Sequence, residues 1–368
     1  MKIICKKSEL LEVFGIVNSV IPTRSTIPEL QNIKLQTQDE KLLLIGTDLE
    51  VGIKAEIKAE IKEKGSSLIP TQRLGTIIRE TSDENIRIET TNSIVHLITC
   101  DGDYKIVGAD PADYPDFPEF DAKKAIDIDA KGLKEMIHKT IFAVSNEITR
   151  YALTGLLVEI KKKEIRIVGS DGKRLAFIKR HSEQSISQDK KVIVPAKGMN
   201  LLERILKDDH RLKMIIDDTQ VKFSILPAKE KYPETVIFSR LVEGSFPDYE
   251  NIIPTDCDKK LDIKNEELYA ALRRVTVVTT DKFKATKLSF KDNKIILMSR
   301  TQDVGEAKVE LDTKYTGEPV EIVFNPDFFI DILRVLGEGT FNRAKRQNFT
   351  GSIQTGKRLS LSRNADDD

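Results

Sequence analysis

Residues 34–47 read KLQTQDEKLLLIGT, in which two β-rich runs flank the polar stretch QDEK. The same plan recurs as LVEIKKKEIRIVGS at 157–170 and as LSFKDNKIILMS at 288–299. Two β-rich runs around a short polar turn are typical of a β-hairpin. Three copies, at intervals of roughly 120 to 130 residues, predict one structural unit that is repeated three times.

Helical patterns repeat at a similar spacing. Apolar residues recur at helical intervals before each hairpin, and a second helical segment follows an apolar β-run (SLIP, VIVP or EIVF) in each unit. Ser8 is a candidate N-cap of the first helix. The expected helices cover residues 8–20, 71–80, 130–144, 196–206, 265–278 and 326–336.

Residues 51–61 alternate most strictly between apolar and mostly polar side chains, which predicts a strand with one buried face in an antiparallel sheet. The motif Tyr-Pro-Asp-Phe at 114–117 has a similar counterpart, Phe-Pro-Asp-Tyr, at 246–249. Both motifs fall where linkers are expected. The fold class is therefore predicted to be α+β, with three repeated domains. The domains are expected at residues 1–124, 125–254 and 255–368.

The composition is that of an ordinary globular protein. The 368 residues include 59 Lys and Arg against 59 Asp and Glu, so the formal net charge is zero. A zero sum argues only weakly against a nucleic-acid partner, because it does not say where the charges lie. No apolar run approaches the length of a membrane span, and no signal peptide precedes the first unit, so a cytoplasmic location is expected. Cys5, Cys100 and Cys257 are far apart and are predicted to be buried free thiols.

Motifs for catalysis or cofactor binding do not occur in the sequence. It contains no phosphate-binding GxxxxGK[ST] loop, no HExxH pair and no GxSxG elbow. Asp101-Gly102-Asp103 lacks the other ligands of a calcium loop, so a hairpin turn is the preferred interpretation. We therefore expect no metal and no cofactor, and a binding role is favoured over an enzyme.

Three motifs resemble the bacterial sliding clamp family, the β subunit of DNA polymerase III. They are GTDLE at 46–50, GSDGKRLA at 169–176 and FPDY at 246–249, and the resemblance runs in register over residues 1–337. It implies a ring of two chains joined head to tail, with sheets outside and two helices per domain lining a hole for duplex DNA. It also implies a non-catalytic processivity factor that tethers the replicative polymerase. A peptide-binding scaffold of the same fold that does not bind DNA is the alternative.

Basic residues on or beside the inner helices are the candidates for DNA contact, because Lys and Arg attract phosphates without reading bases. Arg150 and Tyr151 match positions that contact DNA in family members, although Ala152 stands where the family often has a second aromatic residue. For each Lys or Arg taken alone, a solvated surface charge is the alternative. The candidates are Arg24, Arg73, Arg79, Lys134, Lys139, Arg150, Tyr151, Lys197, Arg204, Arg273 and Arg274.

The resemblance further implies a pocket between the second and third domains. It would take short linear peptides of the polymerase α subunit, the clamp loader, other polymerases and repair proteins. An apolar slot with polar groups at its rim suits a Leu or Phe anchor, whereas simple packing of the domain junction is the alternative. The family often has His in place of Lys173 and Arg in place of Asn251, so a different peptide preference is expected. The candidates are Leu153, Ser170, Gly172, Lys173, Arg174, Leu175, Pro247, Asn251, Ile252, Phe283, Asn325 and Phe328.

The resemblance breaks after Gly337. Family members end in an apolar strand and a Met-Pro-hydrophobic tail that forms one wall of the pocket, whereas this chain ends GKRLSLSRNADDD. One interpretation is natural divergence, with a disordered or differently packed tail. The other is a frameshift near Lys357, because an A-rich stretch that encodes KRLSL reads KDYLY when one A is removed. The nucleotide sequence would distinguish the two.

Overall fold

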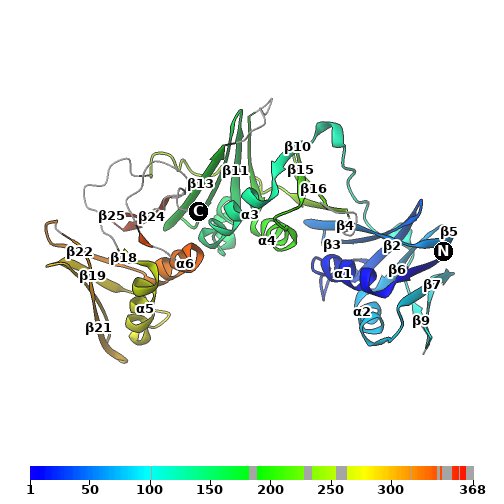
Figure 1. Cartoon of the computed structure of the whole chain (residues 1–368), viewed down its shortest axis with the longest axis horizontal. Coiled ribbons are helices and arrows are strands. Elements are labelled where there is room, and N and C mark those ends of the chain that lie inside the picture. Colours follow the sequence, from blue (N-terminus) through cyan, green and yellow to red (C-terminus); the bar gives the residue numbers. More distant parts are fainter. Residues whose placement is uncertain are drawn as a thin grey trace. The chain divides into compact units, whose positions relative to one another are not determined.

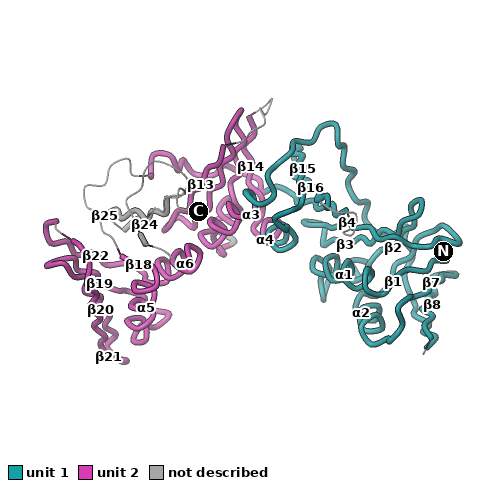
Figure 2. Tube along the Cα trace, in the orientation of Figure 1, with its two compact units in different colours: residues 1–133, 200–241 teal, residues 134–199, 242–368 magenta. Residues whose placement is uncertain are grey.

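The computed structural model describes most of the chain, and it divides into two compact units (Figure 2). Unit 1 consists of residues 1–133 and 200–241, and unit 2 of residues 134–199 and 242–368. The described residues are 1–100, 102–181, 189–227, 234–253, 263–315, 317–337, 340–341, 350–355 and 357–361. Cys257, Asp101 and much of the tail after Gly337 therefore lie outside the described residues.

Unit 1 is built on two antiparallel sheets, which Figure 1 shows together with the helices. The smaller has the order β5(Glu60–Glu63), β1(Lys2–Lys6), β7(Asn85–Thr91), β8(Ile94–Ile98) and β9(Asp103–Val107). The larger has the order β10(Ile126–Asp129), β15(Arg211–Ile216), β16(Gln220–Leu226), β17(Thr235–Arg240), β4(Val51–Lys58), β3(Lys41–Thr47), β2(Asn32–Gln38) and β6(Ser66–Pro70).

Unit 2 holds three further sheets, all with antiparallel pairing. The first has the order β14(Lys190–Pro195), β11(Gly155–Lys161), β12(Glu164–Ser170), β13(Arg174–His181), β24(Thr350–Thr355) and β25(Lys357–Leu361). The second pairs β18(Ile263–Lys264) with β23(Thr340–Phe341). The third has the order β21(Gly305–Asp312), β20(Lys294–Thr301), β19(Thr286–Lys291) and β22(Val320–Phe324).

Six α-helices occur among the described residues, one at each predicted place. Short 3-10 helices cover Pro28–Gln31, Pro111–Asp113, Ala122–Lys124, Ile141–Ala143, Ile148–Leu153 and Thr276–Val278. The α-helices are α1(Lys7–Asn18), α2(Thr71–Glu80), α3(Ala130–His138), α4(Ala196–Ile205), α5(Asn265–Val275) and α6(Pro326–Leu336).

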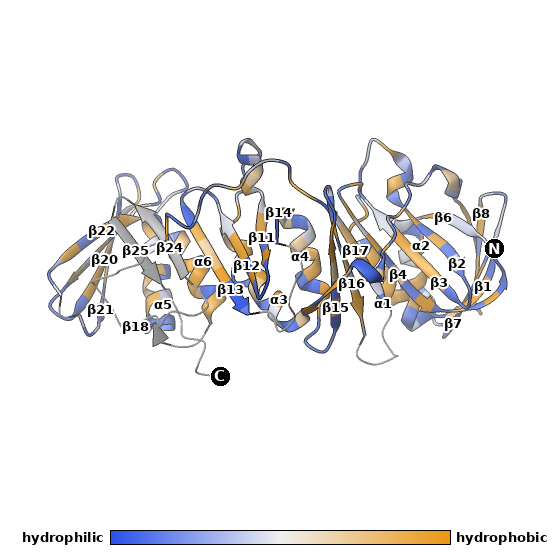
Figure 3. Cartoon of the chain, turned by 90° about the horizontal axis from the view of Figure 1, so that it is seen from above, coloured by the Kyte–Doolittle hydropathy of each residue, from blue (hydrophilic) through white to orange (hydrophobic). Residues whose placement is uncertain are grey.

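The element order confirms the threefold repeat. Strand, helix, four strands, helix and three strands follow one another in the second and third repeats, and the first adds only β5. All three predicted hairpins form, as β2–β3, β11–β12 and β19–β20. Hydrophobic and hydrophilic residues are interspersed along their strands (Figure 3), as expected when one face of a sheet is buried.

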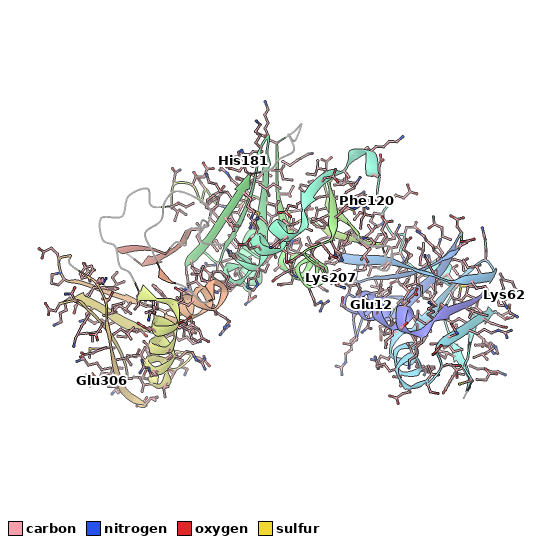
Figure 4. All side chains as sticks on the ribbon, in the orientation of Figure 1. Glu12, Lys62, Phe120, His181, Lys207 and Glu306 are labelled. Carbon is pink, nitrogen blue, oxygen red and sulfur yellow. The ribbon has the colours of Figure 1, made fainter. Side chains whose placement is uncertain are left out.

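Helix α1 covers β3 and β4 in unit 1. Its buried residues include Val17, which lies against β3, and Phe14, whose ring lies against Gly75 of α2. Gly46 on β3 is needed for this packing, because a Cβ there would lie 2.8 Å from a methyl carbon of Val17. A side-chain ion pair also joins the middle of α1 to the residues after α4, since Lys207 lies 4.0 Å from Glu12 (both labelled in Figure 4).

Two of the predicted elements end early. The strand expected at 51–61 stops at Lys58, because Ala59 donates its amide to Glu40 O and the chain then enters the smaller sheet as β5. The helix expected at 130–144 stops at His138. There Thr140 donates its hydroxyl to Met136 O at 2.7 Å, and the following turn tightens into a 3-10 helix.

Three smaller predictions are corrected. Helix α1 starts at Lys7 without any side-chain cap, so Ser8 is not its N-cap. The helix expected to reach residue 278 gives way to a 3-10 turn after Val275. Cys5 is buried as predicted, and burial with the nearby Glu9 raises the pKa of its thiol to about 12. Cys100 is exposed, because it lies beyond the end of β8 rather than inside the sheet.

Candidate functional site

The predicted pocket residues centre on the turn between β12 and β13. Ser170 Oγ accepts the amide hydrogen of Gly172 at 3.1 Å and donates to Arg174 O at 2.8 Å. Asp171 Oδ1 accepts the amides of Lys173 and Arg174 at 2.8 and 2.9 Å. Gly172 takes φ +82°, a left-handed conformation that glycine adopts without steric cost. The turn is therefore held rigidly by its own side chains.

The first repeat contains the same turn between β3 and β4. Thr47 Oγ1 accepts from Leu49 N at 3.0 Å and donates to Val51 O at 2.9 Å. Asp48 Oδ1 accepts the amides of Glu50 and Val51 at 3.0 and 2.8 Å. Leu49 has φ +76°, so a leucine holds the left-handed position that Gly172 occupies in the second repeat. The resemblance between GTDLE and GSDGK thus reflects one hydrogen-bonded turn used twice.

Arg174 links this turn to α6. Its guanidinium contacts Asp171 Oδ2 at 3.1 Å and Asp331 Oδ2 at 2.7 Å, and it donates to Phe142 O at 2.7 Å. It also lies over the ring of Phe328, 4.8 Å from the centroid. Only 13% of the side chain is exposed, so these partners replace most of its hydration. Arg174 joins residues that are more than 150 positions apart in the chain.

An apolar cluster lies beside the turn. Leu153 and Leu175 belong to it together with the linker residues Phe246 and Tyr249, and Ile253 packs against it. The other buried members are Leu157, Val168, Ile193 and Val242. The linker between the predicted second and third domains therefore closes over the sheet beside the turn.

A buried carboxylate anchors that linker. Tyr249 donates its hydroxyl to Glu159 Oε2 at 2.6 Å, and Lys191 Nζ lies 3.1 Å from Oε1. Burial opposes ionisation of Glu159, but these two partners outweigh burial and lower the pKa of the carboxyl. The pKa of Tyr249 is raised mainly by burial and, to a smaller extent, by the hydrogen bond to Glu159. The next linker residue, Glu250, pairs with Arg166 at 2.5 Å.

The other predicted pocket residues have separate positions. Ile252 is half-buried, whereas Lys173 and Pro247 are exposed. Asn251 is exposed and donates its side-chain amide to Asp248 Oδ2 at 2.6 Å. Among the described residues, the cation–π contact of Phe328 goes to Arg174 and not to these four side chains.

Two predicted residues of the third repeat flank α6. Asn325 is the N-cap of this helix, and its Oδ1 accepts the amide of Asp327 at 3.0 Å. The side chain of Phe283 is 66% exposed on the loop before β19. Lys284 fastens that loop to α6 through Asp327 at 2.8 Å.

Sequence reasoning missed Asp331, Phe142 and Glu159. Asp331 follows Phe328 by three residues on a helix, so the two share a face, and this spacing was the available signal. Phe142 contributes a main-chain carbonyl, which no side-chain pattern reveals. Glu159 stands at a buried position of a strand, where an acidic residue signals a paired charge.

The predicted DNA-contact residues are mostly exposed, as their role requires. Tyr151 is 57% exposed. Arg150 is half-buried, and it donates to Asp171 O at 2.5 Å and pairs with Glu147 at 3.2 Å. The exposed residues on helices are Arg73, Arg79, Lys197, Arg204, Arg273 and Arg274.

Three further DNA-contact candidates differ in setting. Arg24 is exposed in a bend after α1 and outside any helix. Lys139 lies just beyond α3, because that helix ends at His138, and it pairs with Glu135. Lys134 is half-buried on α3.

A cavity of about 450 Å³ occurs elsewhere, in unit 1, where the linker after β9 crosses β4, β16 and β17. Its walls mix Lys54 and Glu119 with apolar residues such as Phe120 (labelled in Figure 4), and no predicted site residue lines it. Within the described part of the chain, no group of His, Cys, Asp or Glu could hold a metal ion, and no helix is long and apolar enough to cross a membrane.

Sequence comparison accounts for the repeat. The N-terminal, central and C-terminal domains of the DNA polymerase III beta subunit match residues 1–118, 127–248 and 250–352. The chain belongs to the DNA polymerase III beta subunit family. This confirms the family and the three-domain clamp fold, and it favours a sliding clamp over a scaffold unrelated to DNA. The C-terminal match runs to residue 352, so the resemblance continues beyond Gly337, where it was expected to break.

Individual relatives agree with this assignment. The beta sliding clamp of Chlamydia muridarum is 31% identical over 335 residues, which are 91% of this chain and 90% of that protein. The beta sliding clamp of Bacillus subtilis is 28% identical over 369 residues, which cover 96% of this chain and 94% of that protein.

Solved structures of the family have the same fold. The DNA polymerase sliding clamp of Pseudomonas aeruginosa with ligand has a TM-score of 0.89 at 25% identity and covers 100% of this chain and 97% of that one. The B. subtilis sliding clamp has a TM-score of 0.88 at 26% identity and covers 100% of this chain and 96% of that one.

Proposed function

We propose that this chain is a DNA sliding clamp, a non-catalytic processivity factor that works in the cytoplasm. Two copies would close a ring around duplex DNA and tether the replicative polymerase. Family membership and the threefold repeat support this proposal. We place the domain boundaries near residues 124 and 254, of which the second lies outside the described residues.

The strand edges carry the argument for a ring. The last strand of the second repeat, β17, pairs with β4 of the first, and β24 of the third repeat pairs with β13 of the second. In the first repeat the edge strand β9 then has no partner from another repeat, and in the third repeat the same is true of the edge strand β21. A second copy would pair β9 of one chain with β21 of the other, head to tail, and would thereby repeat the pairing seen within the chain.

Exposed apolar side chains mark the same two edges. Val107 on β9 is 69% exposed, and Tyr104 on the same strand is 37% exposed. At the β21 edge, Val277 is 76% exposed in the 3-10 turn after α5, which contacts β21. Apolar side chains on a free strand edge favour association with a partner strand.

A ring holds DNA without gripping it, because a closed ring cannot leave sideways. Basic side chains that face the hole would attract phosphates through contacts that are mobile and independent of sequence. The exposed arginines of α2 and α5 suit this role. The zero net charge of the chain is compatible with a basic lining and an acidic exterior.

Partner proteins would bind at the turn built by Ser170 to Leu175. The apolar cluster with Leu153 and Leu175 offers a seat for a hydrophobic anchor, and Arg174 fixes the orientation of α6 beside it. The replicative polymerase, the clamp loader and repair proteins would compete for this seat through short linear motifs. The exposed Lys173 and Asn251 would set the peptide preference at the rim.

Retention on DNA of different topology tests the clamp. The loaded protein should stay on nicked circular DNA and be lost when the circle is cut. Arg24→Ala with Lys197→Ala should lower retention more at low salt than at high salt, because salt already screens these phosphate contacts in the unchanged protein. Lys162→Ala with Lys163→Ala, at the exposed tip of the β11–β12 hairpin, is the matched control and should not change retention. Equal retention on circular and linear DNA, or on neither, would reject the ring and favour a scaffold.

A further inference from the structure

Strand β22 has a counterpart in each of the other repeats. Leu68 on β6 pairs with Lys34, Ile193 on β14 pairs with Leu157, and Val323 on β22 pairs with Lys287. Each of these three residues stands three positions before the second helix of its repeat. Leu68, Ile193 and Val323 therefore occupy the same structural position.

The three residues differ sharply in exposure. Leu68 is 0% exposed and Ile193 is 4% exposed, whereas Val323 is 55% exposed. Each lies on the last strand at one end of its sheet. The same position is thus covered in two repeats and uncovered in the third.

The covered positions show what kind of segment fits. Ala109 donates its amide to Leu68 O at 3.2 Å, and Val242 donates its amide to Ile193 O at 2.8 Å. An aromatic residue of the linker, Tyr114 in the first case and Phe246 in the second, then packs into the same apolar cluster. In both repeats an extended segment joins the strand through its main chain and covers the apolar side chain.

The described residues of the third repeat place no such segment on β22. Within them, which leave out 338–339, 342–349, 356 and 362–368 of the tail, no main-chain amide from outside the sheet donates to Val323 O. The last seven residues of the chain, SRNADDD, offer only Ala365 as an apolar side chain. Lys287, which pairs with Val323, forms an ion pair with Glu321 of β22 at 2.8 Å. An edge strand that presents an exposed valine and an available carbonyl is suited to strand addition.

We propose that the free edge of β22 is a strand-addition site for an extended segment of a partner protein. The segment donates an amide hydrogen to Val323 O and lays an aliphatic side chain on Val323, as Val242 does at β14. An aromatic residue four or five positions later covers the sheet, which matches the spacing from Val242 to Phe246 and from Ala109 to Tyr114. This site is additional to the peptide seat at Leu175 and does not depend on it.

A peptide of this chain's own linker is the probe, because it contains both elements. Residues 240–251, RLVEGSFPDYEN, are added as a capped synthetic peptide to the full-length protein. We expect binding by calorimetry with a Kd below about 1 mM. The amides of β22 should become protected from hydrogen exchange in the complex.

Substitutions locate the binding. Val323→Asp should weaken binding at least about tenfold, and the isosteric Val323→Thr should weaken it less, because only the apolar contact is lost. Val304→Asp is the matched control, since Val304 is 52% exposed in the turn before β21. It should bind as the unchanged protein does.

Three outcomes would overturn the proposal. One is no binding by the unchanged protein, and another is equal binding by the Val323→Asp and unchanged proteins. The third is a loss of binding in Leu175→Ala that Val323→Asp does not reproduce, which would assign the peptide to the seat at Leu175. Because the DNA retention experiment does not use this edge, its failure and the failure of the β22 site can be told apart.

Discussion

At the scale of single residues, two charged groups do most to shape the candidate site. Arg174 bonds to side chains or carbonyls in three separate segments, and Glu159 receives the hydroxyl of Tyr249 from the linker. Both are largely buried, so each depends on its partners in place of water. Removing a partner in such a network costs more than removing an exposed ion pair.

Asp331 provides an internal comparison, because two arginines contact it. Arg174→Ala removes the partner at 2.7 Å and leaves the carboxylate poorly compensated, so we expect a loss of about 2–3 kcal/mol in the free energy of unfolding. Arg334→Ala removes a partner at 3.8 Å that is 62% exposed and should cost less than about 0.5 kcal/mol. Urea denaturation of both variants measures the difference, and equal losses would contradict the role given to Arg174.

The bond from Tyr249 to Glu159 should be visible in the pH dependence of stability. The folded pKa of Glu159 is lowered, so its stabilisation is present above the unfolded pKa and is lost as the pH falls through the folded pKa. Tyr249→Phe should therefore lower the free energy of unfolding by about 1.5–2 kcal/mol at pH 7. In acid, the difference in free energy of unfolding between this variant and the unchanged protein should become smaller.

Tyr114→Phe is the control for this pH effect. The hydroxyl of Tyr114 accepts the neutral amide of Thr47 at 3.1 Å, and burial raises the pKa of this tyrosine to about 12. The free energy of unfolding that Tyr114→Phe loses should be the same at neutral and at acid pH. Unfolding at a series of pH values provides the test, and a constant gap for Tyr249→Phe would refute the proposed coupling.

At the scale of elements, the two matching turns show how one backbone serves different purposes. The turn at Thr47 and the turn at Ser170 share four hydrogen bonds, but they differ at the left-handed position. Leu49 fills that position in the first repeat. Gly172 leaves it open in the second, and Arg150 Nη1 lies only 2.4 Å from where a Cβ would be. The glycine therefore permits Arg150 to close over the turn.

Gly172→Ala should disturb both the backbone and Arg150. The left-handed conformation costs an L-residue about 1 kcal/mol, and displacing Arg150 should add about another 1 kcal/mol. Arg150→Ala provides the matched background, because it removes the atom that lies 2.4 Å from the added Cβ and leaves the positive φ of residue 172 in place. Thermal denaturation should show a larger loss for Gly172→Ala in the unchanged protein than in the Arg150→Ala protein, and equal losses would contradict the contact with Arg150.

At the scale of the whole molecule, the open edges of its sheets determine what it can bind. β9 and β21 are the edges left over by the repeat and are assigned to the ring contact. β22 is the opposite edge of the sheet that contains β21, and it is assigned to a partner segment. Two exposed valines, Val277 and Val323, therefore belong to different surfaces and should respond differently to the same substitution.

Native mass spectrometry distinguishes these surfaces. The 41.6 kDa chain should appear as a dimer, and Val277→Asp should convert it to a monomer because a charge would be buried in the contact. Val323→Asp should leave the dimer unchanged. A monomeric unchanged protein, or a dimer that survives Val277→Asp, would contradict the proposed pairing of β9 with β21.

The positions of the helices and hairpins could be predicted because their signals are local. The hairpins at 34–47, 157–170 and 288–299 formed as expected, and α2 and α6 have the predicted bounds. The turn motifs also indicated Ser170 to Leu175 as candidate site residues. Long-range partners could not be predicted in this way, because the chain places Arg174 and Asp331 157 residues apart.

The threefold α+β repeat follows from the sequence alone, because alternation and helical spacing act over a few residues and recur in register, and the turn motifs carry the resemblance to the clamp family. The end of β4, the groups around Arg174 and the exposure of Val323 became known from the tertiary structure. Those features depend on which strands become neighbours and which edge finds no neighbour. Strand pairing is a contact between distant segments, and its free energy is not encoded at either segment alone.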